Sequence, residues 1–216
     1  EFQGLKDPMN WAKEKWFGNK ALLASRMLCF QTAAIHSPLT KSVCSGFDKD
    51  HVKLMKKYAL NNFETVQKYM AQRNSTHMPQ RLEELLTSCN KHSELRDEAY
   101  IAIMKQCTDN EKLADALPRA LELLALCLTV FPPSPEFQDH LEMFIRRRDY
   151  KKYVKKTNAA FLLSRIVYKG PVAEGKVPKR GDYDGTNMHD GRKCKEHAAG
   201  DVLKSRLDLK KSVEPE

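Results

Sequence analysis

Residues 115–131 constrain the fold of this chain most, because their apolar side chains point in nearly every direction around a helix. Leucines, an alanine and a valine fill most positions from Leu121 to Val130, and Pro132-Pro133 follows directly. A helix without a polar face has to be covered on all sides, which predicts that this one lies at the centre of a helical bundle. The apolar run is too short for a bilayer, which needs roughly 20 residues, so no transmembrane segment is expected.

Other parts of the chain show the apolar spacing of amphipathic helices. Asp48 is a predicted N-cap, and the six apolar residues after it recur every three or four positions. They are Val52, Met55, Ala59, Phe63, Val66 and Met70. A helix is predicted after Asp7, where Met9, Ala12 and Trp16 would share one face. Further helices are predicted over residues 20–31 and 79–89, from Ser93, after Ser134 and over residues 149–168. Since no convincing strand pattern occurs, the expected fold class is all-α, a compact multi-helix bundle.

The composition changes after Lys169. Residues 170–200 contain six of the nine glycines, and large apolar residues nearly vanish there. Such a segment buries too little surface to offset its ordering entropy by itself. We therefore expect two parts: a helical domain over residues 1–169, and a glycine-rich, irregular extension or partner-binding strap over residues 170–216.

The residues that usually carry chemistry are scattered. The six cysteines form no CxxC pair, and those at 89, 107 and 127 lie among apolar neighbours, as reduced thiols do in cytoplasmic proteins. The sequence lacks a glycine-rich phosphate loop, a nucleophile elbow and a zinc-protease helix. We predict no catalytic residues, no cofactor and no metal site, and hence a protein that is not an enzyme.

Positive charge is concentrated in the helical part. Residues 1–169 hold 27 of the 37 basic residues and 19 of the 28 acidic ones. A first cluster lies in residues 146–156, where seven residues are basic and one is acidic. Its basic members are Arg146, Arg147, Arg148, Lys151, Lys152, Lys155 and Lys156. A second cluster consists of Lys53, Lys56 and Lys57.

Cations fixed on a helix attract and steer an anionic partner, and these ten residues are the predicted partner-binding site. A merely solvated helix face is the alternative, although such a face usually interleaves both signs. Nucleic acid is disfavoured as the partner, because the aromatic residues needed for stacking fall mostly on core stripes. An acidic protein surface and anionic lipid remain as candidates.

Two linked blocks resemble the signature of the myosin tail homology 4 domain. They are ELRDEAYIAIMKQCTDN at residues 94–110 and RALELLALCLTVFPPS at residues 119–134. An upstream pair, MLCF at 27–30 and PLTK at 38–41, is similar to the opening of that domain. Two departures stand out: the family's usual Gly-Trp is Ala120-Leu121 here, and the Gly-Asp that often ends the long helix is Ala71-Gln72.

The resemblance implies a helical bundle from the tails of unconventional myosins, plant-type kinesins or some Rho GTPase-activating proteins. It assigns the charged triplet Arg96-Asp97-Glu98 to the family signature, for which we expect capping and interhelical ion pairing. Family members act as docking domains, and several bind microtubules through a basic surface. A FERM domain or a GTPase-activating domain can then accompany the bundle in the same parent chain.

We therefore expect a non-catalytic cytoskeletal docking module in the cytoplasm, which binds microtubules or an acidic cargo protein. Two alternatives stay open. In the first, the bundle only positions the catalytic domain of a Rho GTPase-activating protein. In the second, it is a trafficking adaptor whose basic face binds anionic lipid.

Overall fold

The computed structural model describes residues 2–15, 17–46 and 48–147, and these form an all-helical structure. Within these ranges no strand occurs, apart from a single antiparallel bridge between Leu5 and Thr40. The helices are α1 (Pro8–Lys13), α2 (Lys20–Ser25), α3 (Lys49–Tyr69), α4 (Met78–Lys91), α5 (Arg96–Gln106), α6 (Leu113–Val130) and α7 (Gln138–Arg147), with single 3-10 turns η1 (Ser42–Cys44) and η2 (Ser93–Leu95).

The predicted fold class is thus confirmed for the described residues. The helix predicted over 149–168, the boundary after residue 169 and the extension over 170–216 lie outside them.

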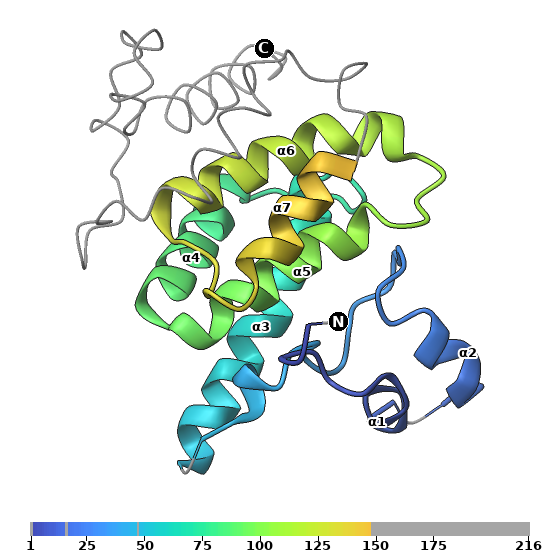
Figure 1. The fold of residues 1–216 in the computed structure, drawn as a ribbon. Coiled ribbons are helices and arrows are strands. Elements are labelled where there is room, and N and C mark those ends of the chain that lie inside the picture. Colours follow the sequence, from blue (N-terminus) through green and yellow to red (C-terminus); the bar gives the residue numbers. More distant parts are fainter. Residues whose placement is uncertain (1, 16, 47, 148–216) are drawn as a thin grey trace, which may run out of the picture.

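Helices α3 to α7 form the bundle, and α1 and α2 lie next to each other at one end of it (Figure 1). The long helix α3 packs on α4 and α5, and α6 packs on α3, α4 and α5. At the start of α7, the Phe137 ring stacks beside Tyr100 of α5 with 6.5 Å between ring centroids. One apolar core therefore joins all five helices.

Side-chain caps start several helices where the sequence predicts them. Asp7 accepts a hydrogen bond from the Asn10 amide at 2.8 Å, and Pro8 follows it as the first residue of α1. Asp48 accepts from the Asp50 amide at 2.9 Å and begins α3. The predicted stripe of α3 is buried from Met55 onward.

Two local predictions at the N-terminal end are wrong. Helix α2 ends at Ser25 and does not continue to residue 31, because side chains of the bundle hold the backbone carbonyls that follow it. In α1, Met9 is exposed and does not share a buried face with Ala12; Trp11 is buried instead, and its indole N–H donates to the Ser37 carbonyl at 3.2 Å.

Helix α5 is buried nearly all round: eight of its eleven residues are buried, including Glu98, Lys105 and Gln106. The expected buried helix, α6, is indeed deep in the core. Polar side chains of a helix usually face solvent, but Glu98, Lys105 and Gln106 of α5 do not. These residues instead face irregular backbone from other parts of the chain.

The charged triplet that opens α5 binds backbone groups of three different segments. Arg96 donates to the carbonyls of Cys89 and Asn90 at 3.1 and 3.0 Å and so caps the end of α4. Asp97 accepts from the Ser134 amide at 2.9 Å, just before α7. The expected capping is therefore present, whereas the interhelical ion pairing is not found for this triplet among the described residues.

Glu98, the third member of the triplet, holds the segment before η1. One carboxylate oxygen accepts from the Leu39 amide, and the other from the amide and the hydroxyl of Thr40, each at 2.7 Å. Burial raises the pKa of Glu98, and these three hydrogen bonds oppose that rise. A carboxylate offers acceptors only, which matches three donors.

At the other end of α5, two buried side chains hold the irregular chain after α2. The Lys105 amino group donates to the carbonyls of Arg26 and Cys29, and burial lowers its pKa from 10.5 to about 8. The Gln106 amide donates to the Gln31 carbonyl at 3.0 Å. Gln67 of α3 donates to the same carbonyl at 2.9 Å, so α3 and α5 are fixed against one loop.

Helix α3 ends in a left-handed residue. The amide of Gln72 donates to the Gln67 carbonyl at 2.9 Å and that of Ala71 to the Lys68 carbonyl at 3.1 Å, which is the Schellman pattern. Ala71 has a φ of 56°, a conformation that glycine adopts without the steric penalty of a side chain. The alanine at this position is therefore a source of backbone strain.

Replacing Ala71 with glycine should relieve this strain and raise the free energy of unfolding by about 0.5–1 kcal/mol. Urea denaturation followed by circular dichroism measures the change. The matched control is Ala59→Gly inside α3, which should lower stability by about 1 kcal/mol or more. A loss of stability in both variants would contradict the assignment.

Replacing Glu98 with glutamine should lower the free energy of unfolding by about 2–3 kcal/mol. The new NH₂ group would then face an amide donor that has no other partner. The control is Glu83, an exposed residue of α4. Its replacement by glutamine should change the free energy of unfolding by less than about 0.5 kcal/mol. Equal effects of the two substitutions in urea denaturation would show that the Glu98 carboxylate does not hold the loop.

Lys105 predicts a dependence of stability on pH. Between its lowered folded-state pKa and its ordinary unfolded-state pKa, the unfolded chain binds more protons, so stability contributed by this group rises with pH. The unfolding free energy of the natural chain, relative to Lys105→Met, should therefore rise by about 1–2 kcal/mol from about pH 7.5 to about pH 9.5. If this difference in unfolding free energy stays constant or falls as the pH rises, Lys105 is not a buried ammonium group with a lowered pKa.

Candidate partner-binding surface

Helix α3 presents a row of lysines to solvent. Lys53, Lys56 and Lys57 are exposed, while Met55 and Ala59 of the same turns are buried. No carboxylate of the described residues lies within 4 Å of these three amino groups. The predicted second cluster is thus an exposed set of cations on a helix whose opposite side is fixed in the core.

The same face of α3 carries further charge toward the end of the helix. Residues at positions 53, 57, 64 and 68 lie within about 60° of one another at 3.6 residues per turn, over a length of about 22 Å. Lys68 lies 2.8 Å from Glu64, four residues before it. Glu64 is the single acidic member of this row.

Two arginines from other segments converge on the same glutamate. Arg81 of α4 lies 3.4 Å from one oxygen of Glu64, and Arg73, from the loop after α3, lies 4.0 Å from the other. The hydrogen bond from Lys68 is the main reason why the pKa of Glu64 is lowered. Because three cations share one carboxylate, the cluster keeps an excess of positive charge. We call Lys53, Lys56, Lys57, Lys68, Arg73 and Arg81 the α3 basic face.

Lys56 also acts on a neighbouring segment. Burial would raise the pKa of Glu14, but hydrogen bonds from Ser37 and Lys6 and the charges of Lys6 and Lys56 lower it overall. Lys6 is the direct partner of Glu14, with 3.0 Å between amino nitrogen and carboxylate oxygen. Lys56 therefore contributes through space while its amino group stays exposed.

The first predicted cluster is only partly described. Arg146 is exposed, but its guanidinium forms an ion pair with Glu142 at 2.6 Å, so its charge is partly neutralised. Arg147 is the last residue of α7. The other five members, Arg148, Lys151, Lys152, Lys155 and Lys156, lie outside the described residues.

The sequence analysis missed Lys68, Arg73 and Arg81. The spacing of Glu64 and Lys68 is a readable signal of a helical ion pair, and the distance of eleven residues from Lys57 to Lys68 places both on one face. The two arginines give no such signal, because only the packing of α4 against α3 brings Arg81 to Glu64.

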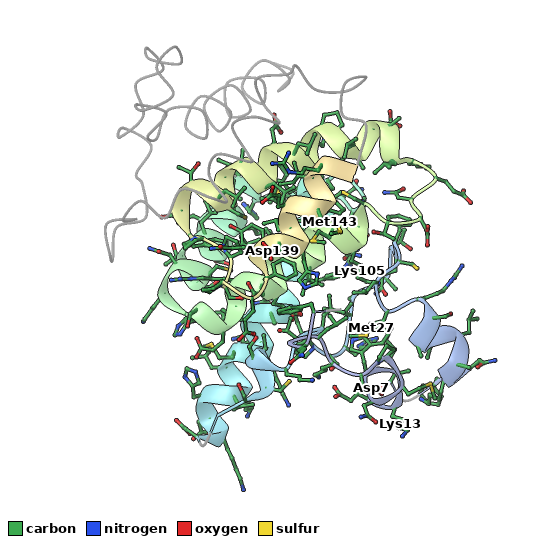
Figure 2. All side chains as sticks on the ribbon, in the orientation of Figure 1. Asp7, Lys13, Met27, Lys105, Asp139 and Met143 are labelled. Carbon is green, nitrogen blue, oxygen red and sulfur yellow. The ribbon has the colours of Figure 1, made fainter. Side chains whose placement is uncertain are left out.

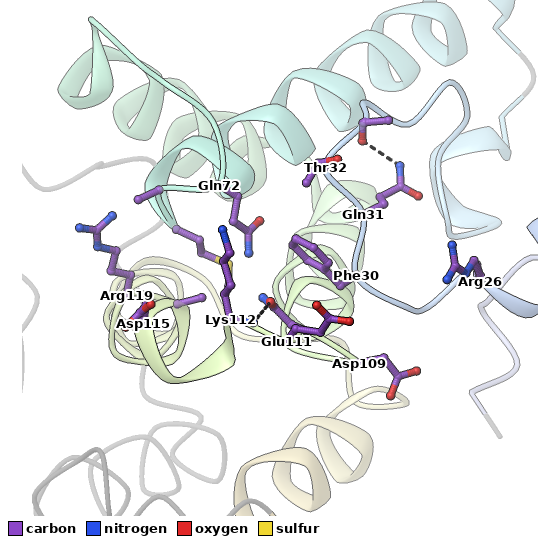
Figure 3. A pocket seen from close by; sticks show the side chains of 15 residues that line it. Arg26, Phe30, Gln31, Thr32, Gln72, Asp109, Glu111, Lys112, Asp115 and Arg119 are labelled. Carbon is purple, nitrogen blue, oxygen red and sulfur yellow. Dashed lines mark hydrogen bonds between the residues drawn. The ribbon is translucent and has the colours of Figure 1, made fainter.

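A cleft of about 710 Å³ lies on a different part of the surface, between the loop after α2, the end of α3 and the start of α6 (Figure 3). Six of its lining residues are charged, three of each sign: Arg26, Lys112, Arg119, Asp109, Glu111 and Asp115. The cleft therefore has no excess charge to attract an anion. The Gln72 side-chain amide, which replaces the family's aspartate, is buried there without a hydrogen-bond partner among the described residues.

Two other kinds of site can be addressed for the described part of the chain. Within it, no three His, Cys, Asp or Glu side chains gather in a way that could hold a metal ion. None of its helices has the length and apolarity required to cross a membrane.

Comparison with known proteins identifies the domain. Residues 82–169 match the MyTH4 domain family. The high molecular weight form of myosin-1 from Acanthamoeba castellanii is 33% identical over 145 residues, which cover 67% of this chain and 8% of that protein. Mouse unconventional myosin-VIIb is 31% identical over 140 residues, which cover 63% of this chain and 6% of that protein. The chain thus spans less than a tenth of the length of these relatives.

Among solved structures, the C-terminal MyTH4-FERM domain of human myosin 7b, in complex with the harmonin-a PDZ3 domain, has the same helical fold. Its TM-score is 0.53 at 24% identity, with 77% of this chain and 32% of that chain covered. The family match, the two myosin relatives and the shared fold agree with the signature blocks at residues 94–110 and 119–134. The chain therefore carries a myosin tail homology 4 domain and belongs to that family.

Proposed function

We propose that this domain is a non-catalytic docking module that binds an acidic protein surface, with the microtubule as the specific candidate, through the α3 basic face. The observation that carries this proposal is a set of three exposed lysines, Lys53, Lys56 and Lys57, on a helix whose other side is held in the core; no carboxylate of the described residues lies within 4 Å of their amino groups. Residues 146–156 are the proposed second part of the same basic surface.

The geometry suits electrostatic docking. Exposed lysines on a rigid helix, next to three further cations that share the single carboxylate of Glu64, raise the local concentration of an anionic partner and steer its approach. Exposed ion pairs are individually weak, at about 0.2–1 kcal/mol each, so several have to act together. Salt screens such contacts over roughly 8–10 Å, so binding should be moderate and strongly salt-dependent.

The context of the relatives supports a docking role. One structural neighbour was solved bound to a PDZ domain of harmonin and joined to a FERM domain. We propose that this domain works likewise as one module of a cytoplasmic, cytoskeleton-associated protein, with a FERM domain as the candidate neighbour. We also propose that the helical domain extends to residue 169 and that residues 170–216 form a separate extension.

Reversing charge on the α3 basic face should weaken microtubule binding. The double variant Lys53→Glu, Lys57→Glu should lower affinity roughly 5–10-fold in co-sedimentation at low salt, and raised salt should reduce the difference. The matched control is Lys41→Glu, Lys112→Glu, which changes net charge equally at exposed positions outside this face. Equal losses in both variants would indicate non-specific attraction.

A second variant separates the two parts of the proposed surface. Reversal of Lys151, Lys152, Lys155 and Lys156 to glutamate should weaken binding further when combined with the α3 changes. Unchanged binding would remove residues 146–156 from the surface. Absence of binding by the unaltered chain at low salt would overturn microtubules as the partner.

A further inference from the structure

Exposed apolar side chains gather on the α1–α2 unit. Among the described residues, six large hydrophobic side chains are exposed, and four of them fall within residues 9–28. These four are Met9, Phe17, Leu22 and Leu28; the other two are Leu54 on α3 and Met143 on α7. Single exposed hydrophobic residues are ordinary, whereas a group in one small unit indicates a contact surface.

Phe17 is the extreme member of the group. It is 87% exposed, and it lies in the loop between α1 and α2. Gly18 follows with a φ of 105°, which a residue with a side chain rarely adopts, and Asn19 caps α2 by accepting from the amides of Ala21 and Leu22 at 3.0 and 3.2 Å. Gly18 and the Asn19 cap thus set the backbone that follows Phe17, and Leu22, 54% exposed, lies in the first turn of α2.

Helix α2 gains little from the core of its own domain. It contributes no fully buried residue, although Leu23 and Ala24 pack partly against the core cluster. An apolar helix of this kind, with an aromatic residue at the adjoining turn, is suited to burial in another apolar medium.

The charge around this loop is positive. Residues 6–28 contain five basic residues and two acidic ones. Both acids are engaged, since Asp7 caps α1 and Glu14 pairs with Lys6. Lys13 and Arg26 are exposed, and the Lys15 amino group lies 4.2 Å from the centroid of the Trp11 ring.

This combination fits one partner chemistry. We propose that Phe17, between α1 and α2, and Leu22, in the first turn of α2, form an interfacial anchor that docks on an anionic lipid bilayer. The apolar side chains enter the boundary between headgroups and acyl chains, while the exposed Lys13 and Arg26 stay among the anionic headgroups. A second copy of this chain is a poor occupant, because two such units carry the same excess charge.

Vesicle flotation of the full 216-residue chain tests this proposal. The chain should float with vesicles of phosphatidylcholine containing about 30% phosphatidylserine and much less with phosphatidylcholine alone. Phe17→Ser should lower the partition coefficient about tenfold or more, because a buried phenyl ring accounts for at least that factor. Lys13→Glu with Arg26→Glu should also weaken binding, because both side chains are exposed.

The control is Met143→Ser, which removes an exposed apolar side chain from α7, far from Lys13 of α1 in Figure 2. It should float like the unaltered chain, and circular dichroism should show that every variant keeps its helices. Flotation unchanged by Phe17→Ser overturns the anchor, as does flotation lost only when Lys53 and Lys57 are reversed. If the unaltered chain does not float with anionic vesicles but still binds microtubules, the anchor is overturned and the proposed function stands.

Discussion

The structure depends on buried polar side chains of α5 that hold irregular backbone from distant parts of the chain. Glu98 holds residues 39–40 at one end of the helix, and Lys105 and Gln106 hold residues 26–31 at the other. A buried polar group costs free energy unless it is paired, so each of these side chains and the loop it binds require one another. The N-terminal segment is thereby fixed against the bundle without forming long helices of its own.

The outer side of α3 takes no part in these contacts and remains exposed to solvent. Its inner side is occupied by the stripe from Met55 to Val66 and by Gln67, which holds the same loop as Gln106. The exposed lysines therefore stand on a helix that cannot easily rotate or shift. A surface that recognises an acidic partner by charge gains from such rigidity, because fewer degrees of freedom are lost on binding.

The sequence predicted the helices well where apolar spacing or caps define them, as for α3, α6 and the N-caps Asp7 and Asp48. It failed for α2, which was expected to reach residue 31, because Lys105 and Gln67 draw the following backbone away from helical geometry and neither contact has a local signal. In the candidate site, Lys53, Lys56 and Lys57 were predicted from the sequence. Arg73 and Arg81 were not, because they reach Glu64 only through tertiary packing.

The dependence of α5 on residues 26–40 also bears on where this domain can be cut. The family match begins at residue 82, inside α4. A chain shortened to that point would lose α1 to α3 together with the loops, leaving the Glu98 carboxylate without its three donors and the Lys105 ammonium without its carbonyls. The segment that matches the family therefore does not contain the whole folding unit, and an autonomous fragment has to include residues 26–40.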